Sequence, residues 1–451
     1  MDENKIVAAI DVGTTKIVAL IGRKNEHGSI DILGYGRTES RGMKRGAVLN
    51  IEEVTTSIAS AVSQAEAEAN MKITEAYIGI AGQHIRSQCF NQPVNRNSAN
   101  DAISQAEVDA LTNQMREVPR EMGEEILHIL PQSYTVDNVS DIKNPVGISG
   151  KQFIGNFHIV FGKTAAANNL RSCVEKNGIK VKGLILEPLA SSTAVLTEDD
   201  KDLGVALVDI GGGTTDIAIF CNGRICYTAV IPCGGNIVTS DIKQGCKIIE
   251  KDAEDLKIQY GSAIETEKMK LQMVSIPGHN GMKPKEISVY NLARFIRARM
   301  EEIIATVAQI IEVSGTKNKL GAGIVITGGG SSLKNLRQLF ALRTGMEIRI
   351  GLPNKRVDNQ EMITNLPSNA TAIGLMTMGI EEMKIKELSF EKNSSATRIS
   401  DKKDETDAQT SGNTQEEAAK EPEKGGKAGE KIKKMWGKFT NWATVIDDEN
   451  V

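Results

Sequence analysis

Two stretches of the sequence, "AIDVGTTKIVALIG" from Ala9 and "LVDIGGGTTDIAIF" from Leu207, contain residue types that suit phosphate binding. In each, an aspartate lies at the end of an apolar segment, a turn of glycine and threonine follows, and a second apolar segment begins. Glycine lets backbone N–H groups approach an anion closely, and consecutive N–H groups form an anion-binding concavity. Threonine hydroxyls add donors, and Lys16 adds a positive charge after the first turn. The two turns therefore predict a site for phosphate groups.

The two aspartates of these stretches, Asp11 and Asp209, would repel a phosphate, but they suit a magnesium ion held through water. Their matched positions indicate an internal repeat, in which two related domains face each other and contribute one loop each. The GxxxxGK[ST] spacing of a Walker A loop and the GxGxxG pattern are both absent. A third glycine turn, Gly328–Gly330, leads from an apolar segment into a predicted helix. One glycine turn alone is more often only a tight turn, whereas the matched pair favours a ligand site.

The elements that position these turns are predicted from the periodicity of apolar residues. A strand–turn–strand unit is predicted around each aspartate, and the helix over 51–70 has one apolar face made by Ile51, Val54, Ile58 and Val62. Further strands are predicted at 29–40, 75–82 and 181–186, and further helices at 165–177, 287–315 and 369–383.

Two regions interrupt this pattern. Residues 84–165 are polar and rich in Asn and Gln, with a helix predicted from about Ser104 and strands near 125–137 and 152–162, so we expect a small inserted α+β domain. Residues 236–313 are predicted to be mostly helical, with a break at the turn-rich "SIPGHNGMKP".

The composition of the 451 residues excludes several classes of protein. A net charge of −4 gives no general reason to expect nucleic-acid binding. The six cysteines form no CxxC pair and the five histidines do not cluster near them, so neither a zinc site nor a disulfide framework is expected. The acidic start "MDENKIVAAIDVG" is unlike a signal peptide, and the sequence contains no apolar run long enough to span a membrane.

The end of the chain differs from the rest. Residues 389–429 contain almost no aliphatic side chains, so we expect a disordered tether there. The segment "KIKKMWGKFTNW" from Lys431 then holds both tryptophans of the protein. On a helical wheel, one apolar stripe is formed by Ile432, Met435, Trp436, Phe439, Trp442 and Ala443, and Lys433, Lys434 and Lys438 lie off that stripe.

This arrangement predicts an amphipathic helix that lies in a membrane interface and is attracted by anionic lipid. One alternative is a helix packed on the protein's own core, against which the long polar tether argues. A second is a motif for the groove of a calmodulin-like partner. The acidic residues after the helix should stay in solution, and the helix itself should form only on lipid because short isolated helices are marginal in water.

Five motifs together resemble the superfamily of actin, hexokinase and DnaK-type chaperones. "AIDVGTTKIVALIG" resembles its phosphate-1 motif, "LVDIGGGTTDIAIF" its phosphate-2 motif and "IVITGGGSSL" its adenosine motif. "EPLASSTAVL" and "NATAIGLMTMG" are similar to its two connecting helices, and all five occur in the expected order. The resemblance implies an α/β, actin-like, two-lobed fold that binds ATP and Mg2+ between its lobes.

The resemblance also implies roles for individual residues. Asp11 and Asp209 would hold Mg2+ through water, with Thr14, Thr15 and Lys16 on the phosphates. Glu187 would orient the attacking water, with Asp209 as the second catalytic candidate; as a helix N-terminal acid, Glu187 is equally well explained by the helix dipole. The implied cofactor-binding residues are Asp11, Gly13, Thr14, Thr15, Lys16, Gly211, Gly212, Gly213, Thr214, Thr215, Glu254, Lys257, Gly328, Gly329, Gly330 and Ser331.

Within the superfamily, the chain resembles the FtsA family of bacterial cell-division proteins, through "AYIGIAGQHI" and "LILEPLASSTAVL" in addition to the phosphate motifs. An inserted subdomain in place of the actin 1B position fits residues 84–165. The implied divisions are 1–83 with 166–200 (subdomain 1A), 84–165 (1C), 201–229 with 311–388 (2A), 230–310 (2B), 389–429 (linker), 430–443 (amphipathic helix) and 444–451 (acidic tail).

This resemblance implies a protein that polymerises with ATP, hydrolyses it weakly if at all, and ties FtsZ filaments to the inner face of the cytoplasmic membrane at the division septum. Its implied partners are the FtsZ C-terminal peptide through 230–310, copies of itself, anionic lipid and later division proteins, and no nucleic acid. Arg294, Arg297 and Arg299 are candidates for an acidic peptide or, equally, form a solvated helix face. The alternatives are a PilM-like pilus-assembly adaptor and a small-metabolite kinase on the same fold.

Overall fold

The computed structural model describes residues 6–26, 29–278, 283–353, 357–358 and 361–382. The chain divides into two units, Met1–Lys386 and Glu387–Val451, and all described residues belong to the first. The predicted tether at 389–429, amphipathic helix at 430–443 and acidic tail at 444–451 lie outside the described residues. No helix in the described ranges is long and apolar enough to cross a membrane.

The first lobe is built on a six-stranded sheet with the order β11-β6-β1-β2-β3-β19. Asp11 lies at the end of β1, which pairs antiparallel with β2 and parallel with β6. The strands are β1 (Ile6–Val12), β2 (Lys16–Lys24), β3 (Ile30–Glu39), β6 (Glu75–Ile80), β11 (Lys180–Leu186) and β19 (Val357–Asp358). One face packs against helices α1 (Ile51–Ala69) and α3 (Thr164–Glu175) in a shared apolar core.

The second lobe repeats this pairing in a five-stranded sheet with the order β14-β13-β12-β17-β18. Its strands are β12 (Val205–Ile210), β13 (Thr215–Cys221), β14 (Arg224–Ile231), β17 (Ile324–Thr327) and β18 (Ile348–Ile350). Here β12 pairs antiparallel with β13 and parallel with β17, as β1 does with β2 and β6. Asp209 therefore occupies in this sheet the place that Asp11 occupies in the first.

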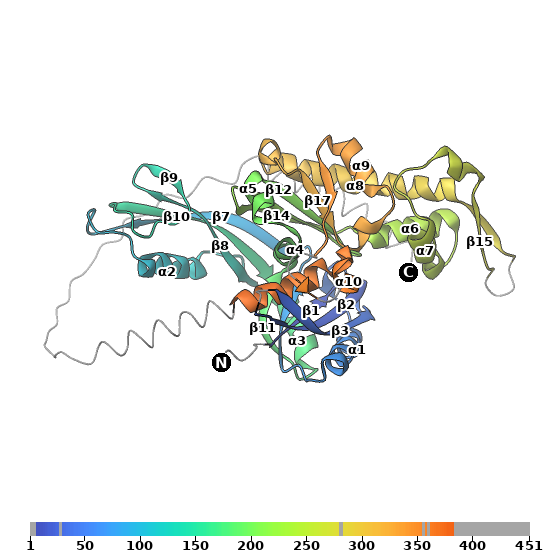
Figure 1. Cartoon of the computed structure of the whole chain (residues 1–451), viewed down its shortest axis with the longest axis horizontal. Coiled ribbons are helices and arrows are strands. Elements are labelled where there is room, and N and C mark those ends of the chain that lie inside the picture. The colour runs from blue at the N-terminus through green and yellow to red at the C-terminus, as the bar shows by residue number, and fades with distance from the viewer. Residues whose placement is uncertain (1–5, 27–28, 279–282, 354–356, 359–360, 383–451) are drawn as a thin grey trace. The chain divides into compact units, whose positions relative to one another are not determined.

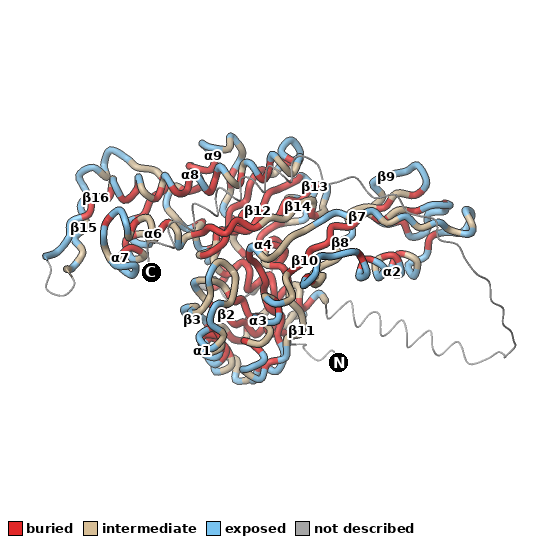
Figure 2. The backbone as a smooth tube through the Cα atoms, turned by 180° about the vertical axis from the view of Figure 1, so that it is seen from behind, coloured by how far each residue is buried: buried red, intermediate tan, exposed pale blue. Residues whose placement is uncertain are grey.

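Two helices pack between the sheets: α4 (Glu187–Val195) and a helix over 370–382 (Figure 1). Apolar side chains of both helices and both sheets form one buried cluster. In Figure 2 the backbone in this central region is mostly red, which marks buried residues. The two helices touch at the backbone, because a Cβ on Gly374 would lie 1.8 Å from the carbonyl oxygen of Ala190. Only glycine fits at this crossing.

The inserted region forms a separate four-stranded sheet with the order β7-β10-β8-β9. Its elements are β7 (Ile85–Asn95), α2 (Gln105–Gln114), β8 (Glu124–Val136), β9 (Val139–Ile142) and β10 (Gln152–Lys163). Strand β7 was not expected, because its side chains are mostly polar and it has no clear alternation. It is held by its full-length pairing with β10.

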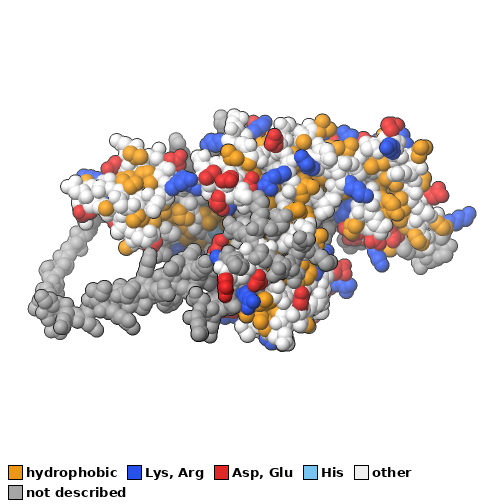
Figure 3. Space-filling model, viewed as in Figure 1, with side chains coloured by type: hydrophobic (Ala, Val, Ile, Leu, Met, Phe, Trp, Pro, Cys, Tyr) orange, Lys and Arg blue, Asp and Glu red, His pale blue; other side chains and the backbone are white. Residues whose placement is uncertain are grey.

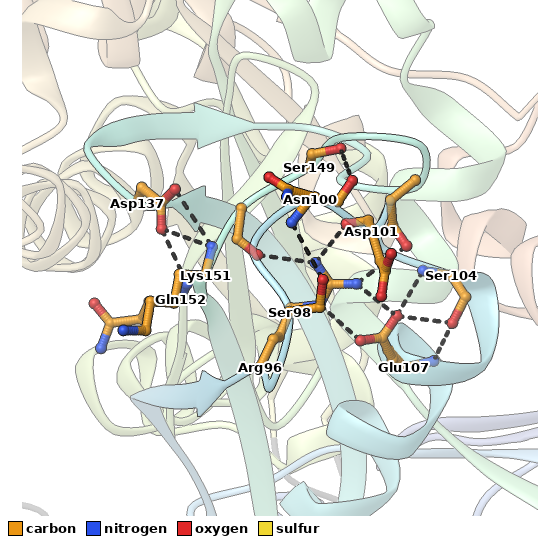
Figure 4. A network of polar contacts seen from close by, with 12 residues as sticks. Arg96, Ser98, Asn100, Asp101, Ser104, Glu107, Asp137, Ser149, Lys151 and Gln152 are labelled. Atoms are coloured by element: carbon orange, nitrogen blue, oxygen red, sulfur yellow. Dashed lines mark hydrogen bonds and ion pairs between the residues drawn. The ribbon is translucent and has the colours of Figure 1, made fainter.

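A polar network closes the loops of this inserted sheet (Figure 4). The Nε of Arg96 donates to Glu107 Oε1 at 2.7 Å, and its Nη1 donates to the carbonyl oxygens of Asp101 and Gly150 at 2.8 Å each. Glu107 also completes a capping box with Ser104 at the start of α2. Arg96 therefore ties the helix to loops on both sides of it.

Residues 230–310 contain helices α6 (Gly235–Cys246) and α7 (Glu250–Tyr260) and most of α8 (Val289–Val313). They also contain an antiparallel hairpin, β15 (Met273–Ile276) with β16 (Lys285–Ser288). The prediction of helix from residue 287 was wrong at its start, because Ile287 and Ser288 pair in this hairpin. "SIPGHNGMKP" had been interpreted as a helix break, whereas most of it joins two strands.

The remaining elements are short. They are β4 (Met43–Lys44), β5 (Ala47–Val48), η1 (Met115–Glu117), α5 (Glu198–Leu203), η2 (Glu267–Leu271), η4 (Lys317–Lys319), η5 (Gly329–Ser332), α9 (Leu336–Thr344), α10 (Glu361–Thr364) and η6 (Pro367–Asn369). Figure 3 shows acidic and basic side chains interspersed over the visible face, with hydrophobic side chains between them.

Candidate functional site

The two glycine–threonine turns meet across a cleft of about 1290 Å³. Each turn is closed by a backbone hydrogen bond, from Gly13 N to Lys16 O at 3.1 Å and from Gly211 N to Thr214 O at 2.9 Å. A Cβ on Gly212 would lie 2.2 Å from the Cγ2 of Thr15, so the turn of one lobe packs against the turn of the other. The matched stretches of the sequence therefore form a single site.

Most of the predicted site residues line this cleft. They are Asp11, Gly13, Thr14, Thr15, Lys16, Glu187, Asp209, Gly211, Gly212, Gly213, Thr214, Glu254, Lys257, Gly328, Gly329 and Gly330. The other two, Thr215 and Ser331, do not line the cleft with their side chains. The fully buried hydroxyl of Thr215 donates to Cys233 O at 2.8 Å, and that of Ser331 donates to Gly328 O at 2.7 Å. Ser331 thus closes its own turn, and Thr215 joins its turn to the segment that follows β14.

Four carboxyl groups face one another in the cleft, and the pKa of each is raised. Burial raises the pKa of Asp11 to about 6, opposed by the charge of Lys16 and assisted by that of Asp209. Burial also raises the pKa of Asp209, opposed by a hydrogen bond from Ser191, by Lys16 and by a hydrogen bond from Thr371. The pKa of Glu187 lies well above its usual range, through burial and then through the charges of the nearby aspartates. A bound cation would relieve this concentration of negative charge.

The fourth carboxyl group belongs to Asp216, which was missed in the sequence. Burial and then the charge of Asp209 raise its pKa to about 8, against a hydrogen bond from Thr214. Its Oδ2 accepts that bond at 2.9 Å, while Oδ1 is buried with no hydrogen-bond partner among the described residues. A signal was present, because Asp216 follows "GTT" in the second stretch as Lys16 does in the first.

Lys16 is the cation within this acidic cluster. Its Nζ donates to Ser368 O and, at 3.5 Å, to Asn369 Oδ1, and it lies 3.9 Å from Asp11 Oδ2. Burial lowers its pKa, and the nearby carboxylates oppose that change. Lys16 thus ties the first turn to the start of the helix over 370–382.

On the opposite wall, Glu254 and Lys257 extend from α7 toward the cleft. Lys257 Nζ donates to Gly235 O at 3.0 Å, to Thr239 Oγ1 at 2.7 Å and to Glu254 Oε2 at 2.7 Å. This network fixes α7 against α6. The glycine turn after β17 is equally constrained, since a Cβ on Gly328 would lie 2.2 Å from Asp209 Oδ1.

The donor set fits a phosphate ligand with a hydrated cation. The cleft offers glycine turns with backbone donors, threonine hydroxyls, Lys16 beside the first turn and a carboxylate oxygen of Asp216 without a partner among the described residues. Within the described part of the chain, no three His, Cys, Asp or Glu side chains form a direct metal-binding cluster. Contact between Mg2+ and the aspartates through water therefore stays a prediction.

Comparisons with known proteins agree with this geometry. The profile described as "Cell division protein FtsA" matches residues 206–374, and that of the "SHS2 domain inserted in FTSA" matches residues 82–161. The FtsA protein of Pseudomonas aeruginosa is 35% identical over 382 residues, which cover 85% of this chain and 91% of that protein. That of Escherichia coli K12 is 34% identical over 88% of this chain and 95% of its own length.

The chain belongs to the FtsA family of cell division proteins. Among solved structures, that of a PilM–PilN type IV pilus biogenesis complex contains a chain that superposes with a TM-score of 0.61 at 14% identity. The match covers 83% of this chain and 98% of that one. At this identity the likeness shows the fold alone, and it confirms the predicted actin-like architecture. The FtsA family membership agrees with the resemblance seen in the sequence.

The arginines expected to serve as peptide ligands are mostly engaged within this FtsA family member itself. Buried Arg299 donates to both carboxylate oxygens of Asp241, at 2.6 and 2.9 Å. Arg297 binds Glu265 and Glu301 at 2.7 Å each. Carboxylates of the chain's own helices and loops occupy these two residues, which argues against their pairing with an acidic peptide. A solvated face was wrong for Arg299, whereas Arg294 is exposed.

The raised pKa of Asp216 predicts that its carboxyl group lowers the folding stability of the nucleotide-free protein, and more so as the pH rises. A carboxyl group with a pKa of about 8 in the folded state and an ordinary pKa of 3.8 favours folding less as the pH rises between these values. We expect Asp216→Asn to raise the melting temperature, with a gain that is larger at pH 8 than at pH 5.5. Thermal unfolding at both pH values measures it, and Asp31→Asn is the control. An equal or smaller gain at pH 8 would contradict the burial of this charge.

Proposed function

We propose that this chain is an ATP-binding, actin-like division protein that ties FtsZ filaments to the cytoplasmic membrane. The observation that carries the proposal is the cleft in which the matched turns of two lobes meet beside four carboxyl groups. Membership of the FtsA family supports a role in division. The remaining elements of the proposal are a lipid-binding tail, a surface for FtsZ and assembly with other copies.

At the cleft, we assign the phosphates of ATP to the two turns. Backbone N–H groups of Gly212 and Gly213, with the Thr14 and Thr15 hydroxyls, are suited to bind phosphate oxygens, while the N–H of Gly211 closes the turn. Lys16 would contribute charge to the β- and γ-phosphates. Gly328 to Gly330 and the α7 pair, Glu254 and Lys257, border the side assigned to adenosine.

Mg2+ bound through water by Asp11 and Asp209 would neutralise charge on the phosphates. Glu187 lines the cleft near Asp11, Asp209 and Asp216, a position that suits the orientation of a water molecule. We assign to Glu187 the role of holding this water. Asp209 is the second catalytic candidate, through the hydrated Mg2+ that it would bind. Any ATP hydrolysis is expected to be slow, with closure of the lobes as the main consequence of binding.

The membrane contact is assigned to residues 430–443. The apolar stripe formed by Ile432, Met435, Trp436, Phe439, Trp442 and Ala443 would enter the interface, and Lys433, Lys434 and Lys438 would face anionic headgroups. Each tail alone would bind weakly, and assembly of the chain with ATP would bring many tails to one surface. The protein would then act on the inner face of the cytoplasmic membrane at the septum.

The contact with FtsZ is assigned to residues 230–310. Because Arg297 and Arg299 are held by internal carboxylates, the exposed Arg294 is the remaining arginine candidate on α8 for an acidic peptide. Binding of later division proteins is assigned to the inserted sheet over 84–165.

A sedimentation experiment with FtsZ, the purified full-length chain and anionic vesicles tests the tether. We expect FtsZ to pellet with the vesicles only when the chain is present, and Trp436→Ala with Phe439→Ala to lower that fraction by about tenfold or more, since burial of each aromatic ring contributes roughly 1.5–3 kcal/mol. Asn441→Ala, on the opposite side of the predicted wheel, is the matched control. If the variant without the two aromatic rings recruits as much FtsZ as the control does, the assignment of membrane binding to residues 430–443 is wrong.

A further inference from the structure

Two hydroxyl groups connect Asp209 to the helices that lie between the sheets. Ser191 on α4 donates to Asp209 Oδ2 at 2.5 Å, and Thr371 on the helix over 370–382 donates to the same oxygen at 3.3 Å. The two hydroxyl oxygens lie 3.0 Å apart. The three side chains thus form a closed triangle of polar contacts, which we call the hydroxyl triangle.

The hydroxyl triangle is mostly buried. Ser191 is 0% exposed, whereas Asp209, at 7%, and Thr371, at 8%, reach the cleft with a small part of their surface. Because so little of this surface is accessible, water replaces a missing hydroxyl donor poorly. A carboxylate that loses a buried hydrogen bond keeps its full desolvation cost, so each donor matters more here than at the surface.

The triangle lies where the two helices cross. Ala190, the neighbour of Ser191, touches Gly374 at the backbone, and Gly374 is one helical turn from Thr371. Because these backbones are in contact, the distance between the two hydroxyls is set by the crossing itself. A shift of one helix relative to the other would therefore change the two hydrogen bonds that hold Asp209.

The two carboxylate oxygens of Asp209 have different neighbours. Oδ2 accepts both hydroxyls, whereas Oδ1 lies beside Gly328, a residue of the cleft wall. Fixing Oδ2 from behind determines the orientation of the whole planar group. The hydroxyls themselves can act on a ligand only through Asp209, apart from the partial exposure of Thr371 to the cleft.

We propose that Ser191 and Thr371 are positioning residues that hold Asp209 for hydrated Mg2+ and join it to the crossing helices. This inference rests on the proposed binding of ATP with Mg2+. Its consequence is that the Mg2+-dependent part of ATP affinity depends on two hydroxyls that belong to the crossing helices. The part of the affinity that does not need Mg2+ depends on other residues.

The same two helices supply matched controls. Ser192 Oγ donates to Leu189 O at 2.7 Å, and Thr377 Oγ1 donates to Ile373 O at 2.8 Å. Ser192 is 2% exposed and Thr377 4%, so both are as buried as the triangle hydroxyls. Their bonds stay within their own helices. Substitutions at these positions therefore remove a buried hydroxyl without touching Asp209.

The test measures equilibrium binding of fluorescent ATP to the full chain, once with Mg2+ and once with EDTA. Ser191→Ala with Thr371→Val should lower the gain in affinity from Mg2+ by about tenfold, with affinity in EDTA unchanged within about twofold. Ser192→Ala with Thr377→Val should keep the whole gain. Thr371→Ser, which retains a hydroxyl, should restore most of what Thr371→Val loses.

The outcomes separate the inference from the proposed function. A full Mg2+ gain in the Ser191 and Thr371 variant, or an equal loss with Mg2+ and with EDTA, would overturn the positioning role. If Asp209→Asn also keeps the full gain, the assignment of Mg2+ to this carboxylate fails as well. Loss in Asp209→Asn without loss in the hydroxyl variant rejects the inference alone. Should the double variant not fold, Thr371→Val against Thr371→Ser decides the question.

Discussion

Gly374→Ala is expected to lower the free energy of unfolding by about 3 kcal/mol or more, an effect at the upper end for a single added methyl group. The new Cβ would lie 1.8 Å from the carbonyl oxygen and 2.3 Å from the carbonyl carbon of Ala190. Both are backbone atoms of α4, so no side chain can rotate away. The helix over 370–382 would have to move relative to α4, and the apolar cluster shared by both lobes would move with it.

Chemical denaturation of the purified variant measures this loss. The control is Gly329→Ala. A new Cβ there would have the Cβ of Ser368 as its nearest neighbour, at an ordinary van der Waals distance of 3.8 Å. We expect the control to stay within about 0.5 kcal/mol of the parent protein. Because alanine is favoured over glycine in a helix by roughly 1 kcal/mol, Gly374→Ala would stabilise the protein if no clash occurred. A Gly374→Ala protein that is more stable than the parent would show that the helices do not cross at the backbone.

The lobes and the cleft were predictable from the sequence because the two repeats place an aspartate and a glycine–threonine turn at matching positions. Asp11 and Asp209 each end a strand that is followed by the same turn, and equivalent turns of two related lobes must face each other to share a ligand. A Cβ on Gly212 would meet the side chain of Thr15, a residue far away in the chain. The sequence predicts the turn, and the structure supplies the contact against which the turn packs.

Other parts depended on contacts that have no local pattern. Strand β7 is polar and was missed, because its pairing with β10 is a long-range interaction. Arg299 was read as a free cation, although Asp241, which binds it, lies on another helix. Thr215 and Ser331 have the residue types of ligand donors, but their hydroxyls satisfy buried carbonyl groups. Asp216 occupies the position that Lys16 has in the first stretch, but its charge is opposite, so the repeat alone did not predict its place in the site.

The second large effect is expected on ATP itself. Asp11→Asn and Asp209→Asn each keep the shape of the side chain and remove one negative charge from opposite lobes. We expect each to lower ATP affinity in the presence of Mg2+ by about a hundredfold, since hydrogen bonds to charged groups contribute up to about 3 kcal/mol. In EDTA the same variants should bind ATP as well as the parent or better, because a repulsive charge is gone.

Equilibrium titration of fluorescent ATP into the full chain with Mg2+ tests the central claim, that one nucleotide is held by both matched turns. The parent protein, Asp11→Asn, Asp209→Asn and the control Ser192→Ala are compared at one pH and salt concentration. The account predicts the loss in both aspartate variants, one from each lobe, and none in the control. Parent-like affinity in either aspartate variant would contradict it, because the nucleotide would then be held without that turn.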